Sequence, residues 1–437
     1  MKRMKIALIS PKVNFSTNIK ELNEFWEKIN KSSSNNNLWF GVSSALLTIA
    51  ALTPAGNNIE FIDENYDKID FSKNYDLVGI SLMTQQAVHG YEIADHFRKM
   101  NVKVVLGGVH VSVLPEEAKS HADCVVIGEA EYVWTEILAD LKKKKLKPIY
   151  KSENVVDLKD SPIPRYDLLK FLNYKFINVQ TSRGCPHDCE YCTASKIFGH
   201  QYRNKSNEQV INEIKLIKKY SNAPFIAFSD DNFLVNRKLS ISLLEKMIDL
   251  KIRWHAQSDI SIGNDIDLLK LMRKSGCNFV FIGLESVSQK SLVGLDKNEW
   301  KLSQLKNYSY YINNIQKQGI GVIGAFIIGL DEDEPADFQK IQNFVIDNNL
   351  YGSSFTILTP YPGSRIREKF KKDNRLEMNS WEHYTGYNVT YLPKKMGKED
   401  IERGIITLYK SIYTNENYLK KMEYFKKIQK SNMVKFK

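Results

Sequence analysis

The sequence lacks any apolar run long enough to cross a lipid bilayer. Its longest stretch of apolar residues and glycine, at 320–330, falls far short of the roughly 20 residues that a membrane-spanning helix needs. The apolar stretch near the start of the chain stops at Pro11, too early for the core and cleavage site of a signal peptide. We therefore expect no transmembrane helix and a cytoplasmic location.

Cysteine is scarce, with five residues in a chain of 437. An odd number does not suit a secreted disulfide framework, and three of the five (Cys185, Cys189 and Cys192) lie within eight residues of one another. Thiols clustered in this way in a reducing compartment more often hold metal. Cys124 and Cys277 lie in apolar stretches and are predicted to be buried core thiols.

Negative charge does not balance positive charge, and the formal net charge is +11. Much of the excess is local: four lysines stand at 142–145, and residues 419–437 contain seven lysines against one glutamate. This distribution argues against an extended basic groove for nucleic acid. The second segment is predicted to form a basic amphipathic helix, which either docks on the body of the protein or contacts a membrane surface or an anionic substrate. Its apolar residues at helical spacing are Leu419, Met422, Phe425 and Ile428.

The length, with 43% hydrophobic and 26% charged residues, indicates a globular chain of more than one domain. We predict a doubly wound α/β domain at 1–141, a linker at 142–172, a parallel βα barrel at 173–370 and a helical basic region at 371–437. The first domain should have strands at 5–10, 59–62, 77–81, 102–106 and 124–127. Ligands of such a domain sit at the carboxyl ends of the strands.

A second alternation of strands and helices begins near Phe176. Six strand-like runs are separated by helical segments near 207–220, 237–250, 265–275, 302–318 and 335–348. This series predicts a complete or partial parallel barrel with its chemistry at the carboxyl ends of the strands. Aromatic and histidine side chains near the strands are candidates to line its cavity, namely Trp254, His255, Tyr361 and Tyr387.

The three clustered cysteines have the spacing C-x3-C-x2-C and directly follow a strand-like run. Three thiolates can ligate three irons of a cubane cluster and leave the fourth iron open. A zinc site normally needs four ligands, and no fourth cysteine is near, although His187 can in principle complete one.

This spacing, with Tyr191 just before the third cysteine, resembles the radical S-adenosylmethionine (SAM) superfamily, in which SAM chelates the open iron. Further matches follow at successive strand ends. The resemblance implies that a polar motif at 229–232 holds the SAM amino group. It also implies that Glu285 binds the ribose hydroxyls and that the strand containing Gly324 packs on adenine. Read singly, the motif's aspartates can be helix caps and Glu285 an ordinary loop acid. The full set of implied SAM-binding residues is Tyr191, Ser229, Asp230, Asp231, Asn232, Gln257, Glu285, Gly324 and Pro360.

The chemistry that the resemblance implies is reductive cleavage of SAM. A [4Fe-4S] cluster, held by the three cysteines, passes an electron to SAM and yields methionine and a 5′-deoxyadenosyl radical. Such an enzyme needs an electron donor such as flavodoxin or ferredoxin.

Three segments of the first domain, at 78–83, 107–110 and 126–131, resemble the strand-end motifs of cobalamin-binding domains fused to radical SAM barrels. Ser81 can donate a hydrogen bond to the dimethylbenzimidazole tail of cobalamin, and Gly107 and Gly108 leave room for that tail. The implied contacts are Ser81, Leu82, Met83, Thr84, Gly107, Gly108, Val109, His110, Gly128 and Glu129.

The chain departs from one version of this domain, because no histidine precedes His89 and the motif Asp-x-His-x-x-Gly is absent. We therefore expect no lower axial histidine from that motif, and residues 83–85 become candidates to lie under the corrin. His110 is expected to be a polar contact and not the cobalt ligand. Loss of cobalamin binding remains the alternative.

The combination resembles class B radical SAM methylases, which implies cobalamin-dependent methyl transfer to an unactivated carbon or phosphorus of a small-molecule, lipid or natural-product substrate. Non-methylating rearrangement, cyclisation or oxidation is an alternative. Modification of tRNA is another, although no RNA-binding module is visible and a nucleic-acid partner is not expected. A non-enzymatic cluster-bearing binding protein is a third.

Overall fold

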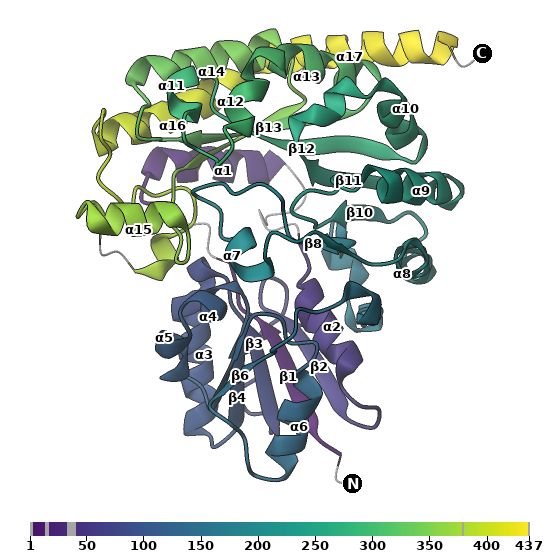
Figure 1. The fold of residues 1–437 in the computed structure, drawn as a ribbon, viewed down its shortest axis with the longest axis vertical. Coiled ribbons are helices and arrows are strands. Elements are labelled where there is room, and N and C mark those ends of the chain that lie inside the picture. The colour runs from purple at the N-terminus through teal and green to yellow at the C-terminus, as the bar shows by residue number, and fades with distance from the viewer. Residues whose placement is uncertain (1–2, 14–16, 33–40, 378–379, 436–437) are drawn as a thin grey trace.

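The computed structural model describes residues 3–13, 17–32, 41–377 and 380–435. Two α/β bodies are stacked along the long axis of the molecule, with the N-terminal body below and the second body above it (Figure 1). None of the helices in these ranges is both long and apolar enough to span a membrane.

The lower body is built on a six-stranded parallel sheet of order β2-β1-β3-β4-β5-β6. Helices α2 (Ser44–Leu52) and α6 (Trp134–Lys142) pack on one face, and α3 (Ala87–Lys99), α4 (Val109–Val113) and α5 (Pro115–Lys119) on the other. The strand order reverses between β1 and β3, which opens a crevice at the carboxyl ends of the strands. The predicted doubly wound fold is confirmed, with strands β1 (Lys5–Ser10), β2 (Asn58–Asp63), β3 (Leu77–Ser81), β4 (Lys103–Gly107), β5 (Cys124–Ile127) and β6 (Ile149–Lys151).

Strand β6 lies inside the segment predicted to be a linker, where it pairs with β5. Three residues after a lysine-rich stretch give too short an apolar pattern to indicate a strand, and pairing with β5 decides the structure instead. The first sheet therefore extends beyond the predicted domain boundary.

The upper body contains a second six-stranded parallel sheet of order β14-β13-β12-β11-β10-β7. Its two outermost strands, β7 and β14, do not pair with each other in the described part of the chain, so the barrel is partial. Helices α8 (Asn207–Tyr220), α9 (Arg237–Met247), α10 (Ile266–Lys274), α13 (Tyr308–Lys317) and α14 (Pro335–Asp347) follow successive strands. All six predicted runs form strands: β7 (Ile177–Val179), β10 (Phe225–Phe228), β11 (Arg253–Ser258), β12 (Cys277–Glu285), β13 (Gly321–Ile328) and β14 (Gly352–Ile357).

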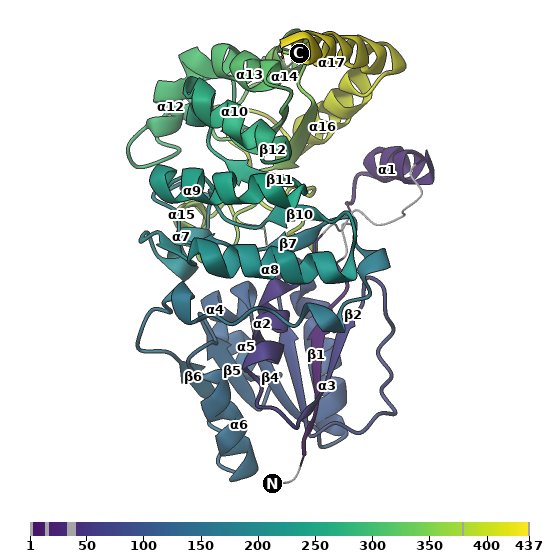
Figure 2. The same ribbon diagram turned by 90° about the vertical axis from the view of Figure 1, so that its right-hand side faces the viewer.

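The chain crosses between the two bodies more often than a linker requires. Helix α1 (Lys20–Ser32) belongs to the first 141 residues but lies at the level of the upper body (Figure 2), where Leu22 and Trp26 join the core. In the opposite direction, Trp381 of the C-terminal region donates a hydrogen bond to the Glu117 carboxylate of the lower body at 3.0 Å. The two bodies are therefore interlocked.

The C-terminal region is helical, with α15 (Arg365–Lys372), α16 (Lys398–Ile412) and α17 (Asn415–Lys435). Phe425 of α17 packs against Tyr351 with ring centroids 5.5 Å apart. Leu419 and Met422 remain 63% and 37% exposed. The predicted helix is present, but its apolar residues are divided between the protein and solvent.

Candidate active site between the two bodies

The three clustered cysteines lie on one loop, closed at its base by a short antiparallel pair, β8 (Ser182–Arg183) and β9 (Arg203–Asn204). The loop also contains helix α7 (Ala194–Phe198). Gly184 has a φ of +92°, and a Cβ atom there would lie 2.3 Å from the Gln201 carbonyl oxygen. Only glycine fits at this sharp turn into the cysteine loop.

The far side of the cysteine loop is attached to the rim of the barrel. The Glu190 amide donates to the Leu295 carbonyl at 3.0 Å, and the Glu190 carbonyl accepts from the Ile366 amide at 3.0 Å. Arg365 forms an ion pair with Asp188. These contacts hold the loop over the carboxyl ends of the strands, where chemistry was predicted.

The three thiols are free, and burial raises the pKa of Cys185 to about 11 and that of Cys189 to about 12. Across the described ranges, no three His, Cys, Asp or Glu side chains converge closely enough to hold one metal ion. Instead of joining the thiols, His187 lies 3.8 Å from an Asp259 oxygen and packs on Trp300. The three thiols suit a cubane cluster, in which each thiolate binds a different iron.

Glu285 is joined directly to the cysteine loop. Its Oε1 accepts hydrogen bonds from the Tyr191 hydroxyl at 2.7 Å and from the Lys301 ammonium at 2.8 Å, and the carboxylate is buried. At Gly283, a Cβ atom would lie 2.4 Å from this oxygen, so glycine lets the side chain fold back over β12. No sequence pattern indicated Lys301, which is a lone lysine on the separate helix α12 (Trp300–Gln304).

The four residues after β10 point in different directions. Asp230 is buried and accepts hydrogen bonds from the Thr181 amide at 3.1 Å and from the hydroxyls of Thr181 and Ser182, so it braces the turn after β7. Asp231 is accessible to solvent, and its charge raises the pKa values of Cys185 and Cys192. Ser229 Oγ and Asn232 Oδ1 are buried without a hydrogen-bond partner.

Such unpartnered buried atoms are rare in folded proteins, and two of them beside the cysteine loop fit a polar ligand such as the amino group of SAM. The Asp230 carboxylate, which was also predicted to contact SAM, accepts hydrogen bonds from protein donors. Gln257 is exposed at the end of β11.

Gly324 lies on the outer side of β13, because a Cβ atom there would contact Leu284 and Leu350 at 3.0 Å. Its neighbours Ile323 and Ala325 occupy the opposite, half-buried side, which faces the barrel interior. Pro360 is buried, and its carbonyl accepts a hydrogen bond from Arg367 at 3.0 Å.

Aromatic side chains close the barrel at the amino ends of its strands. His255 stacks on Phe279 with centroids 4.5 Å apart and meets Phe176 edge-on. Burial lowers the pKa of His255 to about 4, so its imidazole is neutral. Trp254 was a candidate cavity residue but is fully buried on the outer side, where its indole donates to the Ser275 carbonyl at 3.1 Å.

A cavity of about 230 Å³ lies between the two bodies at the carboxyl ends of β3, β4 and β5. A Cβ atom at Gly107 would meet only Val126, at 3.9 Å, and one at Gly128 would meet nothing within 4 Å. These two glycines therefore open the cavity, which suits an aromatic group such as the cobalamin tail. The lower body also lines it with Ser81, Leu82, Met83, Gly108, Val109 and Glu129, and the upper body with Arg183, Ile197, Phe198, Lys205 and Glu213.

His110 and Thr84 lie outside this cavity lining. His110 is fully buried, with its ring nitrogens 3.4 Å from the Thr84 hydroxyl and 3.2 Å from a Glu117 oxygen. Gly108 has a φ of +98°, and a Cβ atom there would lie 2.7 Å from the backbone of Leu82. Both His110 nitrogens therefore face protein partners.

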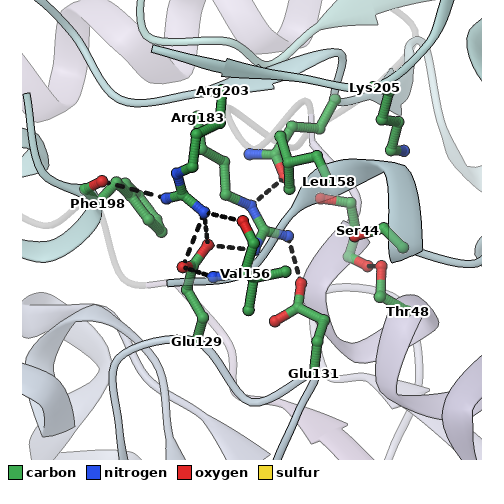
Figure 3. A network of polar contacts seen from close by, with 12 residues as sticks. Ser44, Thr48, Glu129, Glu131, Val156, Leu158, Arg183, Phe198, Arg203 and Lys205 are labelled. Carbon is green, nitrogen blue, oxygen red and sulfur yellow. Dashed lines mark hydrogen bonds and ion pairs between the residues drawn. The ribbon is translucent and has the colours of Figure 1, made fainter. Parts of the chain in front are cut away.

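Glu129, which was predicted to contact cobalamin, lines this cavity, and its carboxylate bridges the two bodies (Figure 3). It binds Arg183 at 2.6 Å and Arg203 at 3.0 Å, while Glu131 binds Arg183 at 2.6 Å. Above the cavity, Lys205 and Glu213 form a buried ion pair of 2.8 Å. Local sequence patterns do not indicate such pairs, because the partners come from separate segments.

Comparison with known proteins identifies the family of this chain. The model of the radical SAM superfamily matches residues 179–345, and that of the B12 binding domain matches residues 45–138. Bacteriochlorophyllide d C-8(2)-methyltransferase of Chlorobaculum tepidum is 31% identical over 385 residues, covering 85% of each chain. Hopanoid C-2 methylase of Rhodopseudomonas palustris is 26% identical, covering 76% of this chain and 64% of that protein.

The fold is also similar to that of the solved cobalamin-dependent S-adenosylmethionine radical enzyme OxsB with aqua-cobalamin bound. The TM-score is 0.70 at 16% identity, covering 98% of this chain and 71% of that one. The predicted fold and family are confirmed: the chain belongs to the radical SAM enzymes that carry a cobalamin-binding domain, with a [4Fe-4S] cluster, SAM and cobalamin as cofactors.

Proposed function

We propose that this enzyme transfers a methyl group to an unactivated carbon of an apolar small-molecule or lipid substrate. The observation that carries this proposal is the shared interface of the two cofactor sites, because helix α7 of the cysteine loop also lines the cavity at the ends of β3, β4 and β5. When bound, the cofactors supply an electron, a 5′-deoxyadenosyl radical and a transferable methyl group.

Different residues of the chain hold each of these groups. Cys185, Cys189 and Cys192 hold the cluster. The Asn232 Oδ1 oxygen accepts a hydrogen bond from the amino-acid part of SAM, and the Ser229 hydroxyl accepts one from it or donates one to it. Asp230 supports the Thr181–Ser182 turn that leads into the cysteine loop.

The Glu285 carboxylate accepts hydrogen bonds from the ribose hydroxyls of SAM, and Tyr191 and Lys301 position this carboxylate. Gly107 and Gly128 make room for the cobalamin tail, and Ser81 and Met83 line the same cavity. His110 would not bind the cofactor through its ring nitrogens, because both of them face Thr84 and Glu117.

The barrel interior favours an apolar substrate, because Phe281, Ile323 and Ala325 present half-buried apolar side chains there. The names of the two relatives also favour an apolar substrate, since one acts on a bacteriochlorophyllide and the other on a hopanoid.

A flavodoxin or ferredoxin in the cytoplasm is the proposed reductant. We also propose that α17 contacts an anionic membrane surface, because exposed Leu419 and Met422 lie among lysines.

The deciding experiment is anaerobic reconstitution with iron, sulfide and hydroxocobalamin, followed by reaction with SAM and a chemical reductant. We expect about four iron atoms and one cobalamin per chain. With the substrate, methylation yields S-adenosylhomocysteine and 5′-deoxyadenosine in equal amounts, because one SAM donates the methyl group and another is cleaved. Formation of 5′-deoxyadenosine alone would support rearrangement or oxidation and overturn methyl transfer. The Cys192→Ala variant is the matched control and should form neither product.

A further inference from the structure

The cysteine loop is a hairpin whose base is attached to the lower body by both of its strands. Arg183 of β8 and Arg203 of β9 are direct cross-strand partners. Both guanidinium groups bind the same carboxylate, that of Glu129, which follows β5 in the lower body (Figure 3). A displacement of Glu129 therefore pulls on both ends of the loop that carries the three cysteines.

These groups form a buried and electrically balanced set, which we call the quartet: Glu129, Glu131, Arg183 and Arg203. The side chains are 10%, 8%, 10% and 9% exposed, respectively. Arg183 uses all three of its nitrogens, since Nε donates to Gln180 at 2.8 Å while the other two bind the two glutamates. Charge-assisted hydrogen bonds from all three nitrogens fix the orientation of the Arg183 guanidinium, and removing one partner leaves a buried charge uncompensated.

The quartet also borders the cavity assigned to the cobalamin tail. Glu129 and Glu131 line it from the lower body, and Arg183 lines it from the upper body. Ile197 and Phe198 of α7, within the cysteine loop itself, complete that side. A group that fills the cavity therefore touches the lower body and the cysteine loop together.

We propose that the quartet is an interdomain latch that makes corrinoid binding and cluster binding mutually cooperative. Filling the cavity holds the two bodies together and orders the base of the cysteine loop, and an assembled cluster in turn closes the upper wall of the cavity. This inference rests on the proposed function, since it requires that both cofactors bind. By linkage, each cofactor must raise the affinity for the other by the same factor.

The test measures this factor in two ways. The dissociation constant of hydroxocobalamin is determined by spectrophotometric titration of the protein with and without a reconstituted cluster. The rate of iron release to a chelator is determined with and without hydroxocobalamin. In the wild-type protein we expect the cluster to tighten hydroxocobalamin binding by at least about 5-fold, and hydroxocobalamin to slow iron release.

Glu129→Gln keeps the shape of the side chain but removes its charge, and should bring the coupling factor close to one. Glu136→Gln is the matched control, because it removes an exposed ion pair with Lys147 at 2.6 Å on the same body and should leave the factor unchanged. If Glu129→Gln fails to fold by circular dichroism, Glu131→Gln removes only one contact of Arg183 and should reduce the factor partially.

The outcomes separate the two proposals. If the wild-type protein binds both cofactors without mutual effect, or if the Glu129→Gln variant keeps the full factor, the latch is wrong and the proposed function stands. If Glu129→Gln does not fold, an unchanged factor in Glu131→Gln also overturns the latch. If the wild-type protein binds no hydroxocobalamin, the proposed function fails and the latch fails with it.

Discussion

Glu285 shows how a single carboxylate can be prepared for a ligand. Its φ of +63° is strained for a residue with a side chain, and it follows a register shift in β12. Two donors from separate segments, Tyr191 and Lys301, converge on one of its oxygens. The strained backbone and the paired donors hold the second oxygen in one place, which suits a pair of hydroxyl groups.

We predict that Glu285→Gln weakens SAM binding by about 10-fold or more, because a hydrogen bond to a charged group contributes roughly 1.5–3 kcal/mol. The amide oxygen still accepts from Lys301, so that buried ammonium keeps a partner and the protein folds. Equilibrium dialysis with labelled SAM measures the change, and the iron content should match that of the wild-type protein. Loss of iron would instead assign Glu285 to support of the cysteine loop.

Adjacent residues can have opposite roles that no sequence pattern distinguishes. Asp230 and Asp231 were both predicted to face SAM, yet the first braces the turn at Thr181 and the second lies near the cysteines. Which of two neighbouring side chains points inward is decided by how β7 and β10 are packed. The sequence could therefore locate this motif but not assign its members.

The loop after β13 is fixed by one buried carboxylate, Asp333. It accepts hydrogen bonds from the Ser291 hydroxyl at 2.5 Å and from the amides of Gly329 and Leu330 at 2.9 Å. Burial nevertheless dominates and raises the pKa of Asp333 from 3.8 to about 6. The folded protein therefore keeps this proton to a higher pH than the unfolded chain does.

Asp333 should consequently stabilise the fold fully below about pH 4 and lose that contribution as the pH rises to about 6. A difference of about two pKa units corresponds to roughly 3 kcal/mol. The melting temperature of the cluster-free wild-type protein should fall by a few degrees relative to Asp333→Asn between pH 4 and 6.5, and then run parallel to it. Parallel curves over the whole range would show that the carboxyl is not buried as described.

The cavity proposed for the cobalamin tail lies at the ends of β4 and β5, and Gly107 borders it without a strained backbone. A side chain there enters open space, because the nearest atom to its Cβ is 3.9 Å away. We predict that Gly107→Leu folds and assembles its cluster but loses hydroxocobalamin on desalting, while Gly107→Ala retains part of it. Absorbance of the desalted protein measures both. Full retention by the leucine variant would place the cobalamin tail elsewhere.

At the scale of the whole molecule, the predicted runs form strands of two parallel sheets, because buried parallel strands leave a strong local pattern. The contacts between the bodies left no such pattern. Helix α1 packs on the upper body through Leu22 and Trp26, and β6 extends the lower sheet. Glu129, Arg183 and Arg203 meet only because the two bodies are stacked.

Helix α17 gives the molecule one basic and partly apolar end. It runs along the top of the upper body and its C-terminal end extends beyond the neighbouring helices (Figure 1). Tyr418, Leu419 and Met422 are exposed, and so are Lys420 and Lys426. Each lysine near an anionic bilayer contributes about 1 kcal/mol of attraction, and exposed apolar side chains add to it by burial.

We predict that the protein sediments with vesicles containing phosphatidylglycerol, that salt releases it, and that Leu419→Glu with Met422→Glu abolishes the binding. Leu172→Glu is the matched control, because Leu172 is a fully exposed leucine on a different element, so its replacement should leave sedimentation unchanged. Equal loss in the control would indicate a general charge effect. Failure of the wild-type protein to bind would leave α17 as a solvated helix and would require the apolar substrate to reach the barrel from solution.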